Sequence, residues 1–146
     1  MDEMLGVIAS KLQLEKTYFG PDLGVDFDSL QAVERFVEHR RGERDWNPDS
    51  DEADELAWLV GSFLGACIVD ATKGEWCVDD RDIPGVRLPN GVVALPFGKA
   101  RKALRVGVAG GESIVGFYRV VVEGFARGDS VTIRRNTLRR PGLLGK

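Results

Sequence analysis

An apolar run that holds two glycines and is followed by Gly-Glu-Trp most constrains how this chain can fold. The run covers residues 56–69 and overlaps the segment LVGSFLGACIVDATKGEWCVDD, residues 59–80. It is shorter than the ~20 apolar residues that span a bilayer, so we expect a buried helix. Gly61 and Gly65 share one face of that helix, which Ala57 continues. Each glycine costs about 1 kcal/mol relative to alanine inside a helix, so we expect the final helix or the sheet to cross closely at this face.

The helix that carries this run should extend over about residues 51–72. Its start has two candidate caps, Asp49 together with Glu52, or Ser50 alone. The neighbouring acids resemble a cation site, but consecutive acids point in different directions, which favours a solvated helix start. Gly74 is placed to end the helix in the left-handed conformation that glycine tolerates.

Two helices are expected upstream of this central one. Apolar residues recur at three- and four-residue steps over about residues 4–12, which favours a short first helix. The second should begin at Asp28, with Asp28 as the cap and Gln31 completing a capping box. Its apolar stripe consists of Leu30, Val33, Phe36 and Val37.

The pattern after Gly74 changes to short runs rich in β-branched and aromatic residues. The runs EWCVDD, GVRLPN and GVVALPF are separated by Pro84-Gly85 and by Asn90-Gly91, which predicts a three-stranded antiparallel meander with a type I′ turn at Asn90-Gly91. A helical period returns at Pro96, and a last helix should cover about residues 112–126, followed by a strand at 131–133.

These elements predict an α+β fold with N-terminal helices, a three-stranded antiparallel meander and two C-terminal helices packed on the sheet. The chain has 146 residues, of which 43% are hydrophobic, as expected for one domain with its own core. We place that domain at residues 1–127 and a basic tail, which need not be fully ordered, at 128–146. Cys67 and Cys77 lie in apolar surroundings and should be buried thiols.

Charge is distributed very unevenly along the chain. Residues 1–80 hold 7 Lys and Arg against 19 Asp and Glu, whereas residues 81–146 hold 13 against 4. Either the two halves meet and neutralise each other within the fold, which we favour, or the molecule has an acidic and a basic face. The acidic start Met1-Asp2-Glu3 does not resemble a secretion signal, so we expect a cytoplasmic protein.

No set of residues predicts catalysis, a cofactor site or a metal site. His39, the only histidine, lies between polar and cationic neighbours and should be a surface residue. The glycine-rich GVAGGES, residues 107–113, lacks the Lys-Ser/Thr of a phosphate-binding loop and should be a connector. Asp79, Asp80 and Asp82 suit a turn in which aspartate accepts backbone hydrogen bonds.

The tail carries the one candidate basic surface. It has no aromatic residues for base stacking, which argues against nucleic acid as a partner. The alternative is a tail that docks on the acidic half of its own or a neighbouring chain. The arginines concerned are Arg134, Arg135, Arg139 and Arg140.

The combined pattern of SFLGACIVDATKGEW, LPNGVVALPFGKARKAL and ESIVGFYRVV, within about residues 53–126, resembles a group of small bacterial domains of unknown function. Those domains have a Leu-Gly helix, a Gly-x-Trp, a short sheet and a Pro-Phe helix start. The resemblance implies an α+β fold and a bacterial cytoplasmic setting, with no catalytic residues to carry over. Some small domains of this kind accompany toxin or secretion systems as neutralising partners.

We therefore expect a non-catalytic protein-interaction domain of immunity or adaptor type, with no cofactor and no membrane contact. Its partner would be another protein, either a second copy of the chain or a component of a toxin or secretion system. One alternative is a small-molecule-binding protein or enzyme whose pocket lies between the long helix and the sheet near Trp76 and Phe97. Another is nucleic-acid binding through the basic tail.

Overall fold

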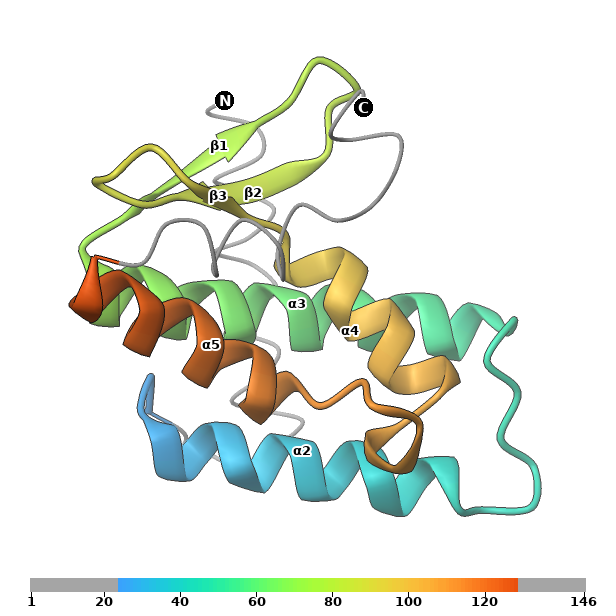
Figure 1. Ribbon diagram of the computed structural model, residues 1–146. Helices are drawn as coiled ribbons and strands as arrows, with labels where there is room; N and C mark the ends of the chain where they lie inside the picture. Colours follow the sequence, from blue (N-terminus) through green and yellow to red (C-terminus); the bar gives the residue numbers. More distant parts are fainter. Residues whose placement is uncertain (1–23, 129–146) are drawn as a thin grey trace.

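The computed structural model describes residues 24–128, which form helices packed against one small sheet (Figure 1). This confirms the α+β class and the three-stranded antiparallel meander. The helix expected at residues 4–12, the strand expected at 131–133 and the tail arginines lie outside the described residues. The elements are α2 (Phe27–Arg41), α3 (Asp51–Thr72), β1 (Glu75–Val78), β2 (Pro84–Arg87), β3 (Val93–Ala94), α4 (Pro96–Arg105), the 3-10 turn η1 (Val108–Gly110) and α5 (Ile114–Arg127).

Helix α3 is the centre of the molecule. Helices α2, α4 and α5 all pack against it, and the sheet contacts it through β2 (Figure 1). By length and composition α3 could cross a membrane, but 67% of its most apolar stretch is buried inside the domain. Of the two C-terminal helices, α4 packs against β2 as well as α3, whereas α5 lies mainly against α3 and α2.

The predicted cap of α2 is wrong by two residues. Asp26, not Asp28, precedes the helix in extended conformation, and its Oδ1 accepts a hydrogen bond from the Ser29 backbone N–H at 2.7 Å. The Gly24 N–H donates to Ser29 Oγ at 3.1 Å, which fixes the chain before Asp26. Both aspartates have a capping side chain, so this contact across the start of the helix decides between them.

The predicted bounds of α3 are confirmed, and the structure selects Ser50 as its cap. Ser50 Oγ accepts from the Ala53 N–H at 3.1 Å. At the other end, Lys73 rather than Gly74 takes the left-handed conformation, with φ of 60°. Gly74 is required for a different reason, because a Cβ there would lie 2.7 Å from the Arg87 carbonyl oxygen.

The first hairpin turns earlier than predicted. Pro84 and Gly85 do not separate two strands but begin β2, where they pair with Val78 and Cys77. Proline is tolerated at the first residue of a strand, so its presence did not mark the turn. The turn lies at residues 79–82, and Asp79 Oδ1 accepts from the backbone N–H groups of residues 81 and 83 at 2.8 and 2.9 Å. The predicted role of aspartate in this turn is therefore confirmed for Asp79.

The second hairpin is present, but its turn is not of type I′. Only Gly91 has a positive φ there, at 90°, whereas a type I′ turn requires positive φ at Asn90 as well. The Gly91 N–H donates to the Leu88 carbonyl at 2.9 Å, so the loop includes Pro89. Proline fixes φ near −65°, which suits the second position of a four-residue turn, so the turn covers residues 88–91.

Candidate functional site

The two glycines of α3 accommodate aromatic rings from the sheet and from α4. A Cβ on Gly65 would lie 2.1 Å from Cη2 of Trp76 in β1, and one on Gly61 would lie 2.4 Å from Cδ1 of Phe97 in α4. The Phe97 Cα would be 3.0 Å from that second Cβ. The expected close crossing is therefore made by the sheet and by α4, not by the final helix.

An open cavity of about 260 Å³ lies beside this contact, and we call it the α3–α4 hollow. Its lining comes from α3, from the start of α4 and from the residues that lead out of the β1–β2 turn into β2. Its two aromatic walls, Trp58 and Phe97, have ring centroids 4.7 Å apart and planes tilted by 53°. The lining residues are Ala57, Trp58, Asp82, Ile83, Pro84, Phe97, Gly98 and Arg101.

Of the two predicted pocket residues, Phe97 lines the hollow and Trp76 does not. Trp76 lies behind Phe97, with ring centroids 5.9 Å apart, and fills the notch at Gly65. Sequence reasoning missed Trp58. A signal for it exists, because Trp58 precedes Gly61 by three residues and so lies on nearly the same helix face.

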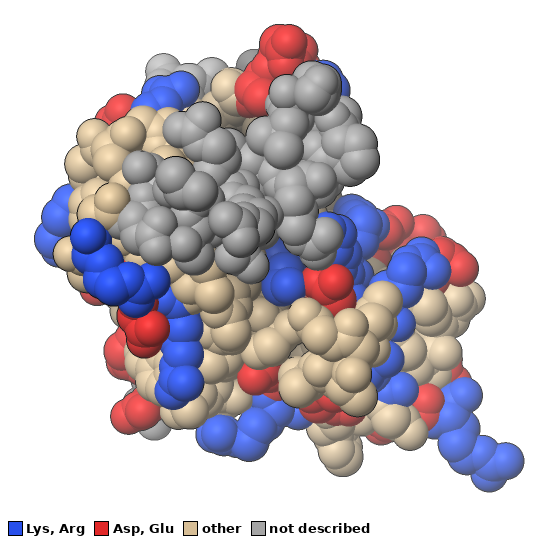
Figure 2. All heavy atoms as spheres, in the orientation of Figure 1, with Lys and Arg blue, Asp and Glu red and all other residues tan. Residues whose placement is uncertain are grey.

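The rim of the hollow is negatively charged on the side of the sheet. Arg101, on the helical side, is neutralised by Asp54, with Nη1 and Oδ1 2.8 Å apart. The Asp82 carboxylate forms no ion pair or hydrogen bond with another described residue. Backbone N–H donation from residues 83 and 81 lowers the pKa of the neighbouring Asp79 below its usual value, so that group stays ionised. Acidic side chains gather over this turn at the top of Figure 2.

A second charged cluster joins α2 to the start of α3. The Arg40 guanidinium donates to Glu52 at 2.8 Å and to Asp45 and Glu43 at 2.9 Å, and it lies 5.2 Å from the ring centre of Trp46. Hydrogen bonding to Arg40 lowers the pKa values of Glu52 and Asp45. All of these acids lie in the acidic half of the sequence, so part of its charge is neutralised locally.

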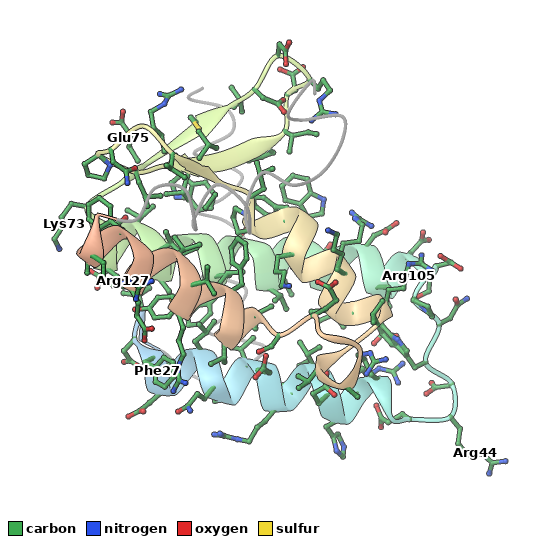
Figure 3. The ribbon with its side chains drawn as sticks, viewed as in Figure 1. Phe27, Arg44, Lys73, Glu75, Arg105 and Arg127 are labelled. Atoms are coloured by element: carbon green, nitrogen blue, oxygen red, sulfur yellow. The ribbon has the colours of Figure 1, made fainter. Side chains whose placement is uncertain are left out.

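The acidic and basic halves of the chain also meet at the start of α3. Arg101 pairs with Asp54, and Arg105 pairs with Asp49. Figure 3 shows Arg105 at the end of α4 that lies beside the first turns of α3. These contacts agree with the favoured interpretation that the halves neutralise each other within the fold.

The polar side of α2 holds the glycine-rich connector between α4 and α5. Glu34 accepts from Ser113 Oγ at 2.7 Å and from the Val115 N–H at 3.3 Å, and Glu38 accepts from the Val108 N–H at 3.1 Å. A carboxylate therefore already occupies the N-terminus of α5, where a phosphate would otherwise bind. The interpretation of residues 107–113 as a connector fits this geometry.

The remaining candidates stay in structural roles. Cys67 and Cys77 are buried thiols, and burial raises the pKa of Cys77. His39 is exposed on α2. Within residues 24–128, no three His, Cys, Asp or Glu side chains gather in a way that could hold a metal ion.

Comparison with known proteins gives no further guide. No protein-family model matches the chain, and neither the curated proteins nor the solved structures provide a match. The function must therefore be argued from the site, and the α3–α4 hollow is the strongest candidate.

Proposed function

We propose that the chain is a non-catalytic protein-interaction domain of immunity or adaptor type, acting in the bacterial cytoplasm. It would bind its partner by taking an apolar side chain of that partner into the α3–α4 hollow. The observation that carries the proposal is an open apolar cavity lined by Trp58 and Phe97, whose rings pack against each other, and by the acidic residue Asp82.

The size of the hollow favours a single side chain over a whole small ligand. Ligand pockets usually enclose about 300–1,000 Å³ and bury most of the ligand, whereas this cavity holds about 260 Å³ and is open to solvent. Protein interfaces commonly depend on one or two apolar anchors that fill pockets of such dimensions. Trp58 and Phe97 supply the aromatic surface that makes these anchors effective.

The charge around the hollow favours a basic partner segment. The β1–β2 turn carries Asp79, Asp80 and Asp82 against one cation, Arg81, which lies 3.3 Å from Asp79. An arginine or lysine next to the apolar anchor would gain from this excess of negative charge and would select against acidic partners.

A small-molecule-binding protein or enzyme is the second candidate, and the same hollow supports it. A hollow lined by two aromatic rings and an acidic residue can hold a small organic cation through cation–π and ionic contacts. A metabolite that binds only the folded chain would raise its melting temperature. A thermal-shift screen that includes organic cations separates this candidate from the first. Nucleic-acid binding through Arg134, Arg135, Arg139 and Arg140 stays a prediction, to be tested by the salt dependence of binding.

The experiment for the leading proposal is affinity capture with the full chain as bait and a pair of matched variants. Ile83→Arg places a cation in the hollow, whereas Val108→Arg makes the same change at a position 43% exposed in the α4–α5 connector. A stoichiometric partner that is retained by the wild type and Val108→Arg but lost by Ile83→Arg supports the proposal. A partner retained equally by both variants contradicts the use of the hollow.

A further inference from the structure

The sequence that follows α5 has the chemistry that the α3–α4 hollow favours. Residues 129–146 read DSVTIRRNTLRRPGLLGK, and we call them the C-terminal segment. They contain the same pattern twice, TIRRN at 132–136 and TLRRP at 137–141, in which an apolar residue precedes two arginines. An apolar anchor followed by cations is the kind of partner that the apolar walls and acidic rim predict.

We propose that Leu138 of the same chain occupies the α3–α4 hollow and that Arg140 pairs with Asp82. The inference rests on the proposed function, because it uses the hollow as a docking site and names its intramolecular occupant. An external partner would have to displace this segment in order to use the hollow.

The length of the C-terminal segment decides which of its two patterns fits. Helices α3 and α5 run side by side in the same direction, and Lys73 and Arg127 lie at the same end of the molecule (Figures 1 and 3). The hollow at Trp58 lies about 21 Å back along α3 from Thr72, at 1.5 Å per helical residue. An extended chain that leaves Gly128 covers about 3.3 Å per residue, which is ~16 Å by Ile133 and ~33 Å by Leu138. Of the two patterns, therefore, only the one that contains Leu138 reaches the hollow.

The alternation of an extended chain then assigns the two arginines different roles. Side chains at positions i and i+2 lie on one face, about 7 Å apart along the chain. With Leu138 in the hollow, Arg140 therefore faces the domain and Arg139 faces solvent. Asp82 is the acceptor available to Arg140, because this residue lines the hollow and its carboxylate has no ion-pair or hydrogen-bond partner among residues 24–128. Arg101, the cation at the rim, is already paired with Asp54 at 2.8 Å, which reduces its repulsion of a basic segment.

Trypsin cleavage of the full-length protein after Arg135 tests this docking. The protease must bind several residues on both sides of that bond, and Leu138 lies only three residues beyond it. Cleavage therefore requires Leu138 to leave the hollow. Release of the fragment that begins at Asn136, followed by mass spectrometry, measures the population of the undocked state. We expect Leu138→Ser and Ile83→Arg each to accelerate the release about tenfold, as burial of one leucine implies. Arg140→Glu should accelerate it about threefold to fivefold, because an ion pair at an open site contributes less than a buried leucine.

Matched controls separate docking from general electrostatics. Arg139→Glu removes the same charge as Arg140→Glu from the adjacent position, and Val108→Arg adds the same charge as Ile83→Arg at a remote site. Both controls should change the rate less than twofold, and Asp82→Arg combined with Arg140→Glu should restore slow release. Equal acceleration by Arg139→Glu and Arg140→Glu would overturn the proposal, as would protection that increases with protein concentration, since the occupant would then belong to a second copy.

The two proposals fail in distinguishable ways. If Ile83→Arg abolishes partner capture but leaves the cleavage rate unchanged, the hollow binds a partner and the C-terminal segment does not occupy it. If Ile83→Arg accelerates cleavage but leaves partner capture unchanged, the segment docks and the partner uses another surface. Circular dichroism of each variant shows whether the fold is retained, so that only folded variants are compared.

Discussion

Three small residues on one face of α3 meet three different environments. Gly65 faces the ring of Trp76, and Gly61 faces the ring of Phe97, so a ring of the domain itself fills the space beside each glycine. Ala57, on the same face, borders the open hollow. The closed and open ends of this face lie only about 12 Å apart along the helix. Where the domain places an aromatic ring against α3, at Gly61 and Gly65, the face is closed. Beside Ala57 a cavity is left that another molecule can enter.

Among the three positions, substitution of Gly65 should have the largest effect on the stability of the domain. Gly65→Leu has no space beside Trp76, so we expect the domain to unfold or to lose about 3 kcal/mol or more. Thermal unfolding followed by circular dichroism measures it. Gly116→Ala is a suitable control, because a Cβ there comes no closer than 3.4 Å to Ser113, and it should be neutral or stabilising by up to ~1 kcal/mol. A soluble Gly65→Leu protein with an unchanged melting temperature would contradict the close contact.

Substitution of Gly61 should have an intermediate effect on stability, and that effect should depend on the ring of Phe97. Gly61→Ala forces the Phe97 ring to move, and we expect a loss of about 1–2 kcal/mol. Phe97→Leu removes the ring atoms that clash, so the double variant should lose less than the sum of the single ones, by at least ~0.5 kcal/mol. Chemical denaturation of the four proteins measures this coupling. Strict additivity would indicate that the two residues do not contact each other.

Ala57 is only 2% exposed, but it lines the hollow, so we expect enlargement to be tolerated better there than at Gly61 because the added atoms can enter the cavity. Ala57→Met adds a flexible apolar side chain, and we expect the free energy of unfolding to change by less than ~1 kcal/mol. The same variant should weaken partner capture, since methionine would occupy part of the site. A loss of stability as large as that of Gly61→Ala would mean that the face is closed at this position too.

The smallest effect on stability should come from the ion pairs between Arg40 of α2 and the acids at and before the start of α3. The pKa values of Glu52 and Asp45 lie below their ordinary values of 4.5 and 3.8 because Arg40 binds their ionised forms. These groups therefore stabilise the fold above those ordinary values, and the contribution is lost as the pH falls through the lowered pKa values.

Urea unfolding at pH 6, 4 and 3 tests this expectation. Arg40→Gln should show a shallower decline in stability between pH 6 and pH 3 than the wild type. Arg44, whose exposed side chain points into solvent in Figure 3, supplies the control. Arg44→Gln should follow the wild-type profile, and an identical slope in both variants would show that the Arg40 contacts add nothing to the pH dependence.

Local patterns predicted the elements of this fold better than their ends. The bounds of α3 were confirmed because a capping serine precedes one long apolar run. The start of α2 was wrong because Asp26 and Asp28 offer the same side chain, and the choice depends on the contact between Gly24 and Ser29. The predicted left-handed residue after α3 was wrong, because Lys73 takes that conformation and Gly74 is required by its distance to the Arg87 carbonyl.

The candidate site was predictable only in part. Phe97 was expected from the Pro-Phe start of its helix, next to the long helix. Trp58, Ile83 and Arg101 come together only after the β1–β2 turn folds over α3 and α4. That turn was itself misplaced, because Pro84 was interpreted as a breaker although it begins a strand. Contacts between segments so distant in sequence have no periodicity that a single sequence reveals.

The polar side of α2 has a consequence for the synthesis of this protein. Arg41 donates to the carbonyl of Leu104 at 3.3 Å, and Glu34 accepts from the N–H of Val115 at 3.3 Å. These partners are translated more than 60 residues after α2. Because contacts between distant residues form only when both are available, α2 cannot complete its packing until the ribosome has passed residue 115. A chain that stops before that point would lack the backbone N–H of Val115 and would leave Glu34 without this partner.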